Sequence, residues 1–189
     1  MDAKRALRRK IKALRDGLGA DARQRIDAAI ADNVSELAPY ALAPVVFTYL
    51  SAGSEVDTRG IIRNAWANGK TVAIPRCVPG SRLMEWHVIE SFEGLEKGSL
   101  GIDEPPANPA TLINPSQQGP LSVALVPALS YDPYGFRLGY GGGYYDTFLP
   151  SFPGVSIGLC RNAQLSTAPL PTDLHDAPVS FVVTETGVL

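Results

Sequence analysis

Cysteine, histidine and long apolar runs are scarce in this chain of 189 residues, and each shortage argues against a class of protein. Cys77 and Cys160 are far apart in sequence with no Cys-x-x-Cys spacing, so we expect neither a disulfide scaffold nor a cysteine zinc site. His87 and His175 are also far apart, and two distant histidines make no metal site. The longest apolar runs, such as residues 123–126, have the length of a strand, so we expect no membrane association.

The N-terminal residues lack the apolar core of a secretory signal. Their alternation of basic and apolar side chains is typical of a folded amphipathic helix, although an arginine-rich organellar leader has a similar composition. Because lone cysteines suit a reducing compartment, we expect a cytoplasmic protein.

Charge is unevenly distributed along the chain. Residues 1–25 contain nine of the 17 basic side chains but only three of the 19 acidic ones. Lys4, Arg8, Lys12 and Arg15 follow one another at helical spacing and form a basic ridge. This ridge either pairs with the acidic remainder of the chain or faces the phosphates of a ligand. A nucleic-acid-binding arm is disfavoured, because the rest of the chain is acidic and no aromatic residues accompany the basic ones.

Two helices are predicted at the start of the chain. Apolar residues recur at steps of three and four, first at Leu7, Ile11, Leu14 and Leu18, then at Ile26, Ile30, Val34 and Leu37. The first helix is expected to end near Gly17–Gly19. The second is expected to be capped by Asp21 and to end before Pro39.

Strands and helices alternate in the rest of the chain. Strands are predicted at 45–50, 71–75, 82–89, 121–127, 155–160 and 180–185, with helices within 55–69 and from Tyr144, and an irregular segment at 90–120. This order predicts an α/β fold: a single three-layer domain, residues 1–189, with a mostly parallel central sheet. Ligands of such sheets bind outside the carboxyl ends of the strands, here within 50–57, 127–146 and 160–176.

One segment in these loops is unusually rich in glycine. Residues 135–146 read GFRLGYGGGYYD and come between a predicted strand and a predicted helix. Glycines allow the backbone to approach a ligand closely, so successive N–H groups can face an anion, but a plain strand-to-helix turn has the same composition. No Gly-Lys-Ser/Thr follows, so the segment is not a P-loop. Arg137 could bind phosphate oxygens, and Asp146 could either bind Mg²⁺ or pair with the helix dipole.

The segment 126–150, VPALSYDPYGFRLGYGGGYYDTFLP, resembles the signature of the 5-formyltetrahydrofolate cyclo-ligase family. Further similarities run along the chain in the same order: KRALR at 4–8, YLSAGSEVDT at 49–58, GKTVAIPR at 69–76, GIDEP at 101–105, IGLC at 157–160 and LHD at 174–176. The resemblance implies a ligase of folate one-carbon metabolism that uses ATP and magnesium to convert 5-formyltetrahydrofolate to 5,10-methenyltetrahydrofolate, releasing ADP and phosphate. It implies small-molecule substrates, and we expect a monomer.

The same resemblance implies roles for individual residues. ATP binding is implied for Lys4, Arg5, Ala6, Leu7, Arg8, Arg137, Leu138, Gly139, Tyr140, Gly141, Gly142, Gly143, Tyr144 and Tyr145, with Arg137 and Tyr145 in catalysis. Leu50 and Glu55 match folate-contacting positions, although without the resemblance an N-terminal carboxylate of the following helix would be the preferred role for Glu55. Asp146 and Asp176 resemble the magnesium ligands. Met84 and Trp86 could pack against the pterin or its aryl ring, but we expect core packing for both.

Tyr140 stands where the family pattern has an arginine. A tyrosine hydroxyl can donate one hydrogen bond but carries no fixed positive charge. We therefore expect Arg76 or Arg161, which both follow strands, to supply part of that charge. The alternative is a non-catalytic folate- or nucleotide-binding homologue; an enzyme of similar fold acting on sugar phosphates is disfavoured by the Tyr-Tyr-Asp ending.

Overall fold

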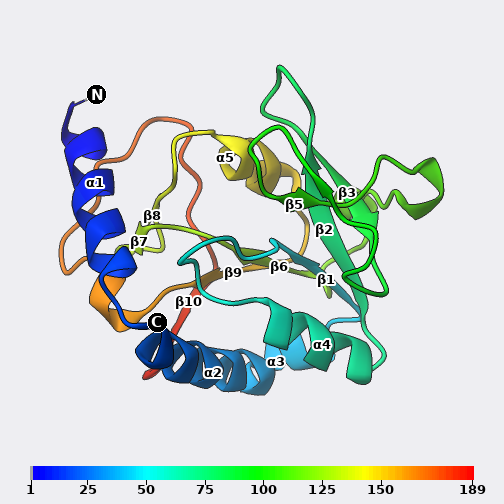
Figure 1. The fold of residues 1–189 in the computed structure, drawn as a ribbon, viewed down its shortest axis with the longest axis horizontal. Coiled ribbons are helices and arrows are strands. Elements are labelled where there is room, and N and C mark those ends of the chain that lie inside the picture. Colours follow the sequence, from blue (N-terminus) through cyan, green and yellow to red (C-terminus); the bar gives the residue numbers. More distant parts are fainter. Residues whose placement is uncertain (1) are drawn as a thin grey trace.

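The computed structural model describes residues 2–189 and has a seven-stranded sheet at its centre (Figure 1). Its strand order is β11-β10-β9-β6-β1-β2-β3. The strands are β1 (Val45–Thr48), β2 (Thr71–Cys77), β3 (Met84–Val88), β6 (Val123–Val126), β9 (Val155–Leu159), β10 (Phe181–Thr184) and β11 (Gly187–Val188). The five from β10 to β2 are parallel, and β3 and β11 are antiparallel edges. The predicted α/β fold with a mostly parallel sheet is confirmed.

Helices cover both faces of this sheet because its strands are apolar on both sides. On one face lie α2 (Ala20–Glu36), α3 (Ala38–Leu42) and α4 (Arg59–Ala67), which pack against alternate strand residues such as Val46 and Leu125. On the other face, Phe47 packs edge-on against Trp86 with ring centroids 5.2 Å apart, next to α5 (Tyr144–Phe148). The predicted three layers are therefore present, and Trp86 belongs to the core as expected.

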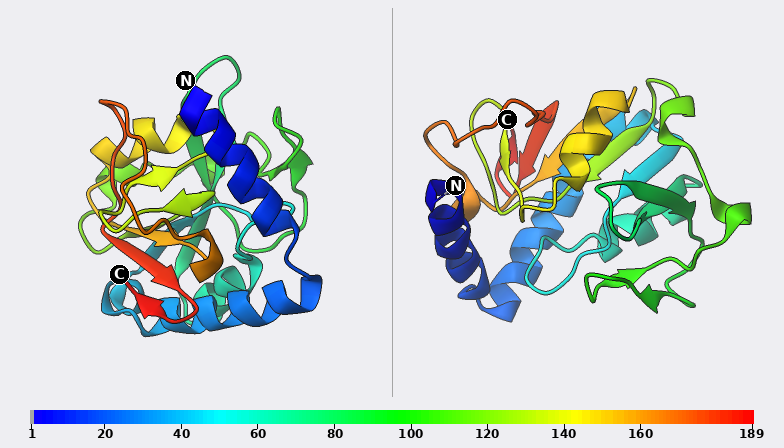
Figure 2. Two further views of the ribbon diagram at one scale, coloured as in Figure 1. Left: turned by 90° about the vertical axis from the view of Figure 1, so that its left-hand side faces the viewer. Right: turned by 90° about the horizontal axis from the view of Figure 1, so that it is seen from above.

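Helix α1 (Asp2–Asp16) lies outside both layers, at the end of the sheet (Figure 2). It packs against the short 3-10 turn Asn162–Gln164, which comes after β9. Leu7 and Ile11 contact a small apolar cluster, whereas Leu14 is 40% exposed. The helix thus lies near the carboxyl ends of the parallel strands.

Several boundaries differ from the prediction for local reasons. Gly19, not Asp21, caps α2, and Asp21 lies in its first turn. Helix α2 stops at Glu36, before Pro39 as predicted, but Pro39 then lies in the first turn of the short helix α3, where its missing N–H costs no hydrogen bond. The segment 90–120 contains the hairpin β4 (Glu96–Lys97) and β5 (Asp103–Glu104). A second hairpin, β7 (Ser130–Tyr131) and β8 (Arg137–Leu138), leads into the glycine-rich segment.

Candidate active site

The order in which strands are added to the sheet reverses at β1. From β1 it proceeds through α4 to β2 on one side, whereas β6 joins on the other side of β1. This is the switch point at which open α/β sheets bind ligands. A cavity of about 1000 Å³ lies there, lined by Tyr49 and Leu50 after β1 and by Pro127 after β6.

Helix α1 closes one side of this cavity with its basic ridge. Lys4, Arg8 and Arg15 line the cavity, whereas the Lys12 side chain is 60% exposed and pairs with Asp16 on the surface. The Arg8 Nε donates a hydrogen bond of 2.8 Å to the carbonyl oxygen of Gly139. The ridge therefore turns cations toward the glycine-rich segment, which comes more than a hundred residues later in the chain.

The glycine-rich segment lines the cavity from Arg137 to Thr147. Gly141 and Gly143 have φ values of 103° and 75°, a region that L side chains rarely adopt. A Cβ atom on Gly141 would lie 3.6 Å from the Arg8 guanidinium carbon, and one on Gly143 would lie 3.2 Å from the Arg82 Cδ. Arg8 and Arg82 thus lie against the loop at these two glycines. Neither glycine could be replaced without straining the backbone there.

Two ion pairs connect the predicted phosphate-binding and magnesium-binding residues. Arg137 pairs with Asp146 and also donates a hydrogen bond of 2.6 Å to the carbonyl of Ala177. Lys4 Nζ lies 2.7 Å from an oxygen of Asp176. Burial acts to raise the pKa of Asp176, but the hydrogen bond and charge of Lys4 outweigh it and lower that pKa below its usual value. The Asp176 carboxylate is therefore available as an anion inside the cavity.

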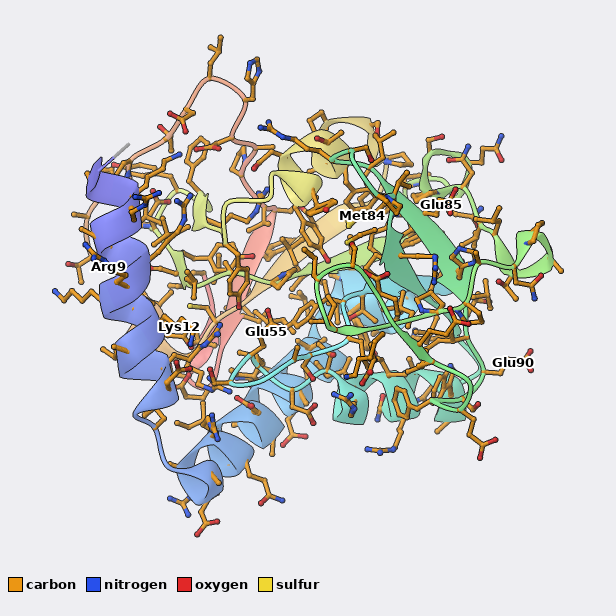
Figure 3. All side chains as sticks on the ribbon, turned by 45° about the horizontal axis from the view of Figure 1, so that its top comes forward. Arg9, Lys12, Glu55, Met84, Glu85 and Glu90 are labelled. Carbon is orange, nitrogen blue, oxygen red and sulfur yellow. The ribbon has the colours of Figure 1, made fainter. Side chains whose placement is uncertain are left out.

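A buried ion pair fixes the loop that carries Glu55. The Arg161 guanidinium is fully buried and donates two hydrogen bonds of 2.7 Å to the Asp27 carboxylate. It also donates to the carbonyls of Ser54 and Glu55, at 2.9 and 3.0 Å. Glu55 lines the cavity and accepts a hydrogen bond of 2.9 Å from the Ala52 N–H. Helix α4 begins only at Arg59, so Glu55 is not a carboxylate in its first turn, and that alternative role is wrong. Figure 3 shows Glu55 on the side of the sheet that faces α1.

The cavity lining includes Tyr49, Tyr140 and Tyr145, of which Tyr140 is 47% exposed. Burial, and after it the nearby charge of Glu55, raises the pKa of each hydroxyl well above its usual value, so all three remain protonated donors. The Tyr49 hydroxyl donates to the carbonyl of Val56 at 3.0 Å. The Tyr145 hydroxyl is buried and has no hydrogen-bond partner among residues 2–189. A buried unpaired hydroxyl in a cavity is suited to a polar atom of a ligand.

The cavity brings together most of the residues named from the sequence. Its lining includes Leu50, Glu55, Asp146, Asp176 and eleven of the fourteen residues assigned to ATP. Arg5, Ala6 and Leu7 do not line it: the first two are exposed, and Leu7 packs against the apolar cluster of Leu129, Leu138 and Leu170.

The expected replacement for the missing arginine is wrong on geometric grounds. Arg76 donates to the carbonyl of Pro105, Arg161 is bound to Asp27, and neither lines the cavity that contains Tyr140. Arg15 instead donates a hydrogen bond to the Tyr140 hydroxyl. The sequence signal for Arg15 was its place on the basic ridge, whereas Arg82 lies in a turn between strands and had no signal.

The fold defines an α/β protein with a cavity at the switch point of its sheet, and cations, carboxylates and a glycine-rich loop line that cavity. Residues 1–185 match the sequence model of the 5-formyltetrahydrofolate cyclo-ligase family. The chain belongs to this family, as its sequence motifs predict.

Individual relatives are similar over almost their whole length. The 5-formyltetrahydrofolate cyclo-ligase of Mus musculus is 31% identical over 97% of this chain and 94% of its own. The Escherichia coli enzyme of the same name is 29% identical over 94% and 98%. The NMR structure of Aquifex aeolicus 5,10-methenyltetrahydrofolate synthetase superposes with a TM-score of 0.82 at 28% identity, covering 98% of this chain and 91% of that one.

Proposed function

We propose that this protein catalyses the ATP- and magnesium-dependent cyclisation of 5-formyltetrahydrofolate to 5,10-methenyltetrahydrofolate, with release of ADP and phosphate. The observation that carries the proposal is the lining of one cavity by four segments that are distant in sequence. These are the start of α1, the loop with Leu50 and Glu55, the glycine-rich segment and the Asp176 loop. A fold-level likeness alone would not require these residues to meet.

The folate is proposed to bind at the end of the cavity next to β1. Glu55 offers carboxylate oxygens that can accept hydrogen bonds from the N–H groups of a pterin. Leu50 provides an apolar contact on the same loop, and the loop is fixed by the buried pair of Arg161 and Asp27. Such a fixed carboxylate loses little freedom on binding, which favours recognition of one orientation of the ring.

The triphosphate is proposed to bind between α1 and the glycine-rich segment. Lys4, Arg8 and Arg137 supply positive charge, and the backbone of residues 139–143 can approach phosphate oxygens closely because it has no side chains at four of its five positions. In the structure, Lys4 and Arg137 are paired with carboxylates. ATP would exchange these pairs for phosphate contacts.

Asp146 and Asp176 are the residues proposed to hold magnesium. No cluster of three or more histidine, cysteine or acidic side chains suited to a metal occurs within residues 2–189. Two carboxylates nevertheless fit Mg²⁺, which commonly uses one or two and completes its shell with water and phosphate oxygens. When bound, the ion would neutralise charge on the phosphates.

The proposed reaction has two bond-forming steps. The formyl oxygen attacks the γ-phosphorus, an O–P bond forms, and the bond to the bridging oxygen breaks as ADP leaves. N10 then attacks the activated formyl carbon and loses its proton, and phosphate leaves with the electrons of the C–O bond. This chemistry needs positioning and charge stabilisation rather than a protein nucleophile. Arg137 would stabilise the phosphoryl oxygens, and the unpaired Tyr145 hydroxyl would donate a hydrogen bond to an oxygen in transfer.

We further propose that the protein acts as a single-domain monomer in the cytoplasm, on small molecules rather than on nucleic acid or membranes. Both cysteines are free thiols, as is usual in a reducing compartment. No helix of residues 2–189 has the length and apolar character needed to cross a bilayer. Light scattering after size exclusion would test the monomer, for which a mass near 20.1 kDa is expected.

The test of the function is direct. Purified protein, 5-formyltetrahydrofolate and Mg-ATP should give the absorbance of the methenyl product, and omission of ATP or magnesium should abolish it. Tyr145→Phe should lower kcat by about 10²–10³-fold, as loss of one transition-state donor does, whereas the matched change at exposed Tyr134 should have no effect. Binding of folate or ATP without any product would instead support the non-catalytic homologue.

A further inference from the structure

Arg15 is a buried cation with no carboxylate partner. It is 4% exposed, its Nε donates a hydrogen bond of 2.9 Å to the Ser54 hydroxyl, and its Nη1 donates to the Tyr140 hydroxyl. Its guanidinium carbon lies 5.5 Å from the centre of the Tyr140 ring. Within residues 2–189 it forms no ion pair, and its Nη2 has no hydrogen-bond partner.

An anion that contacts the guanidinium directly would complete this arrangement. Arginine is almost never buried unless it is paired, because removing its charge from water costs several kcal/mol. The other buried arginine, Arg161, is neutralised by Asp27, and the cavity residues Lys4 and Arg137 are also paired. Arg15 lines the cavity too, but both of its direct hydrogen-bond partners are neutral hydroxyls; the nearest carboxylate along this network is Asp16, which accepts a hydrogen bond from the Ser54 hydroxyl. Its geometry is that of a cation oriented toward a negatively charged ligand.

Arg15 lies between the two ends of the cavity that are proposed to bind the triphosphate and the folate. Tyr140 belongs to the glycine-rich segment and follows Gly139, whose carbonyl accepts from Arg8 at the triphosphate end. Ser54 directly precedes Glu55, at the folate end. A group that contacts both Tyr140 and Ser54 is therefore at the boundary between nucleotide and folate, where phosphoryl transfer would occur.

We propose that Arg15 binds the phosphoryl group in transfer and supplies the positive charge that Tyr140 cannot supply. The proposal rests on the proposed function. While the bond from the formyl oxygen to phosphorus forms and the bond to ADP breaks, negative charge is spread over three equatorial oxygens. The Tyr140 and Ser54 hydroxyls fix the guanidinium beforehand, so that little reorganisation is needed when this charge develops. Tyr140 is then a positioning residue for Arg15.

The first test removes the charge of Arg15. Arg15→Leu should lower kcat by about 10²–10³-fold, because preorganised charge acts in the transition state, while the dissociation constant of Mg-ATP changes far less. Arg9→Leu is the matched control, since Arg9 is an exposed arginine on the same helix and should keep wild-type kinetics. Ser54→Ala keeps the charge and removes one anchor, so its loss should be at least about tenfold smaller, in line with one of several supporting hydrogen bonds.

The second test moves the charge. In the double variant Arg15→Leu/Tyr140→Arg the guanidinium would enter the same part of the cavity from the glycine-rich segment, and we expect at least about a tenfold recovery of kcat over Arg15→Leu.

A purely structural role for Arg15 predicts different results. Ser54→Ala would then reproduce the loss of Arg15→Leu, and the double variant would recover nothing; either result overturns the proposal, as does an unchanged kcat for Arg15→Leu. Wild-type protein that forms no methenyl product would refute the proposed function itself, which separates the two failures.

Discussion

Replacing Gly141 by alanine should damage both stability and nucleotide binding, and Gly139 offers a matched control two residues away. The φ of Gly141 is 103°, and a Cβ atom there would lie 3.6 Å from the Arg8 guanidinium carbon. Gly139 has no positive φ, and a Cβ atom there would meet nothing within 4 Å. The two substitutions add the same methyl group to the same loop but only one strains the backbone.

The magnitude follows from the backbone conformation. A non-glycine residue in such a sparsely populated region costs about 1–3 kcal/mol. For a chain of this size, each kcal/mol shifts Tm by about 2–4 °C, so Gly141→Ala should lower Tm by about 2–12 °C. Gly139→Ala should leave Tm unchanged or raise it, because alanine restricts the unfolded chain and can stabilise by about 0.4–1 kcal/mol.

Calorimetry and steady-state kinetics would measure the two effects separately. Gly141→Ala should raise the KM for ATP more than Gly139→Ala does, because at Gly141 the loop backbone and Arg8 would both have to shift. Equal Tm and KM values for the two variants would refute the argument that the positive φ at Gly141 shapes the loop for its ligand.

Other parts of the structure give further expectations. Arg82→Ala should raise the KM for ATP with little change in Tm, because Arg82 is exposed and lies against Gly143; an unchanged KM would remove it from the site. Asp27→Ala should lower the free energy of unfolding by about 3–5 kcal/mol, since it leaves a buried arginine charge unpaired, and urea denaturation would measure this. Burial raises the pKa of Cys77 to about 11 and that of Cys160 to about 12. At pH 8 both thiols should therefore alkylate at least about 100-fold more slowly than an ordinary cysteine, with rates that rise with pH; fast alkylation at pH 8 would contradict this burial.

The sequence predicted the order of the main sheet strands along the chain because their apolar runs are bounded by glycine and proline. It did not predict β7, β8 or β11, which are two residues long and carry no periodic pattern. The candidate site was largely predictable from the family motifs, since these name residues on loops that parallel strands bring to one edge. The partner of Tyr140 was not, because Arg15 reaches it across 125 positions of sequence through the docking of α1.

The docking of α1 also determines when the cavity can exist. This helix contributes Lys4, Arg8 and Arg15, yet its apolar contacts are few and it lies outside the main core. Its attachment includes contacts with cavity residues, among them Asp176, Gly139 and Tyr140. A ligand that binds these residues would therefore exchange contacts with the helix itself. Assembly of the cavity and docking of α1 are then a single equilibrium, and nucleotide should protect the amide protons of α1 from exchange more than those of α2.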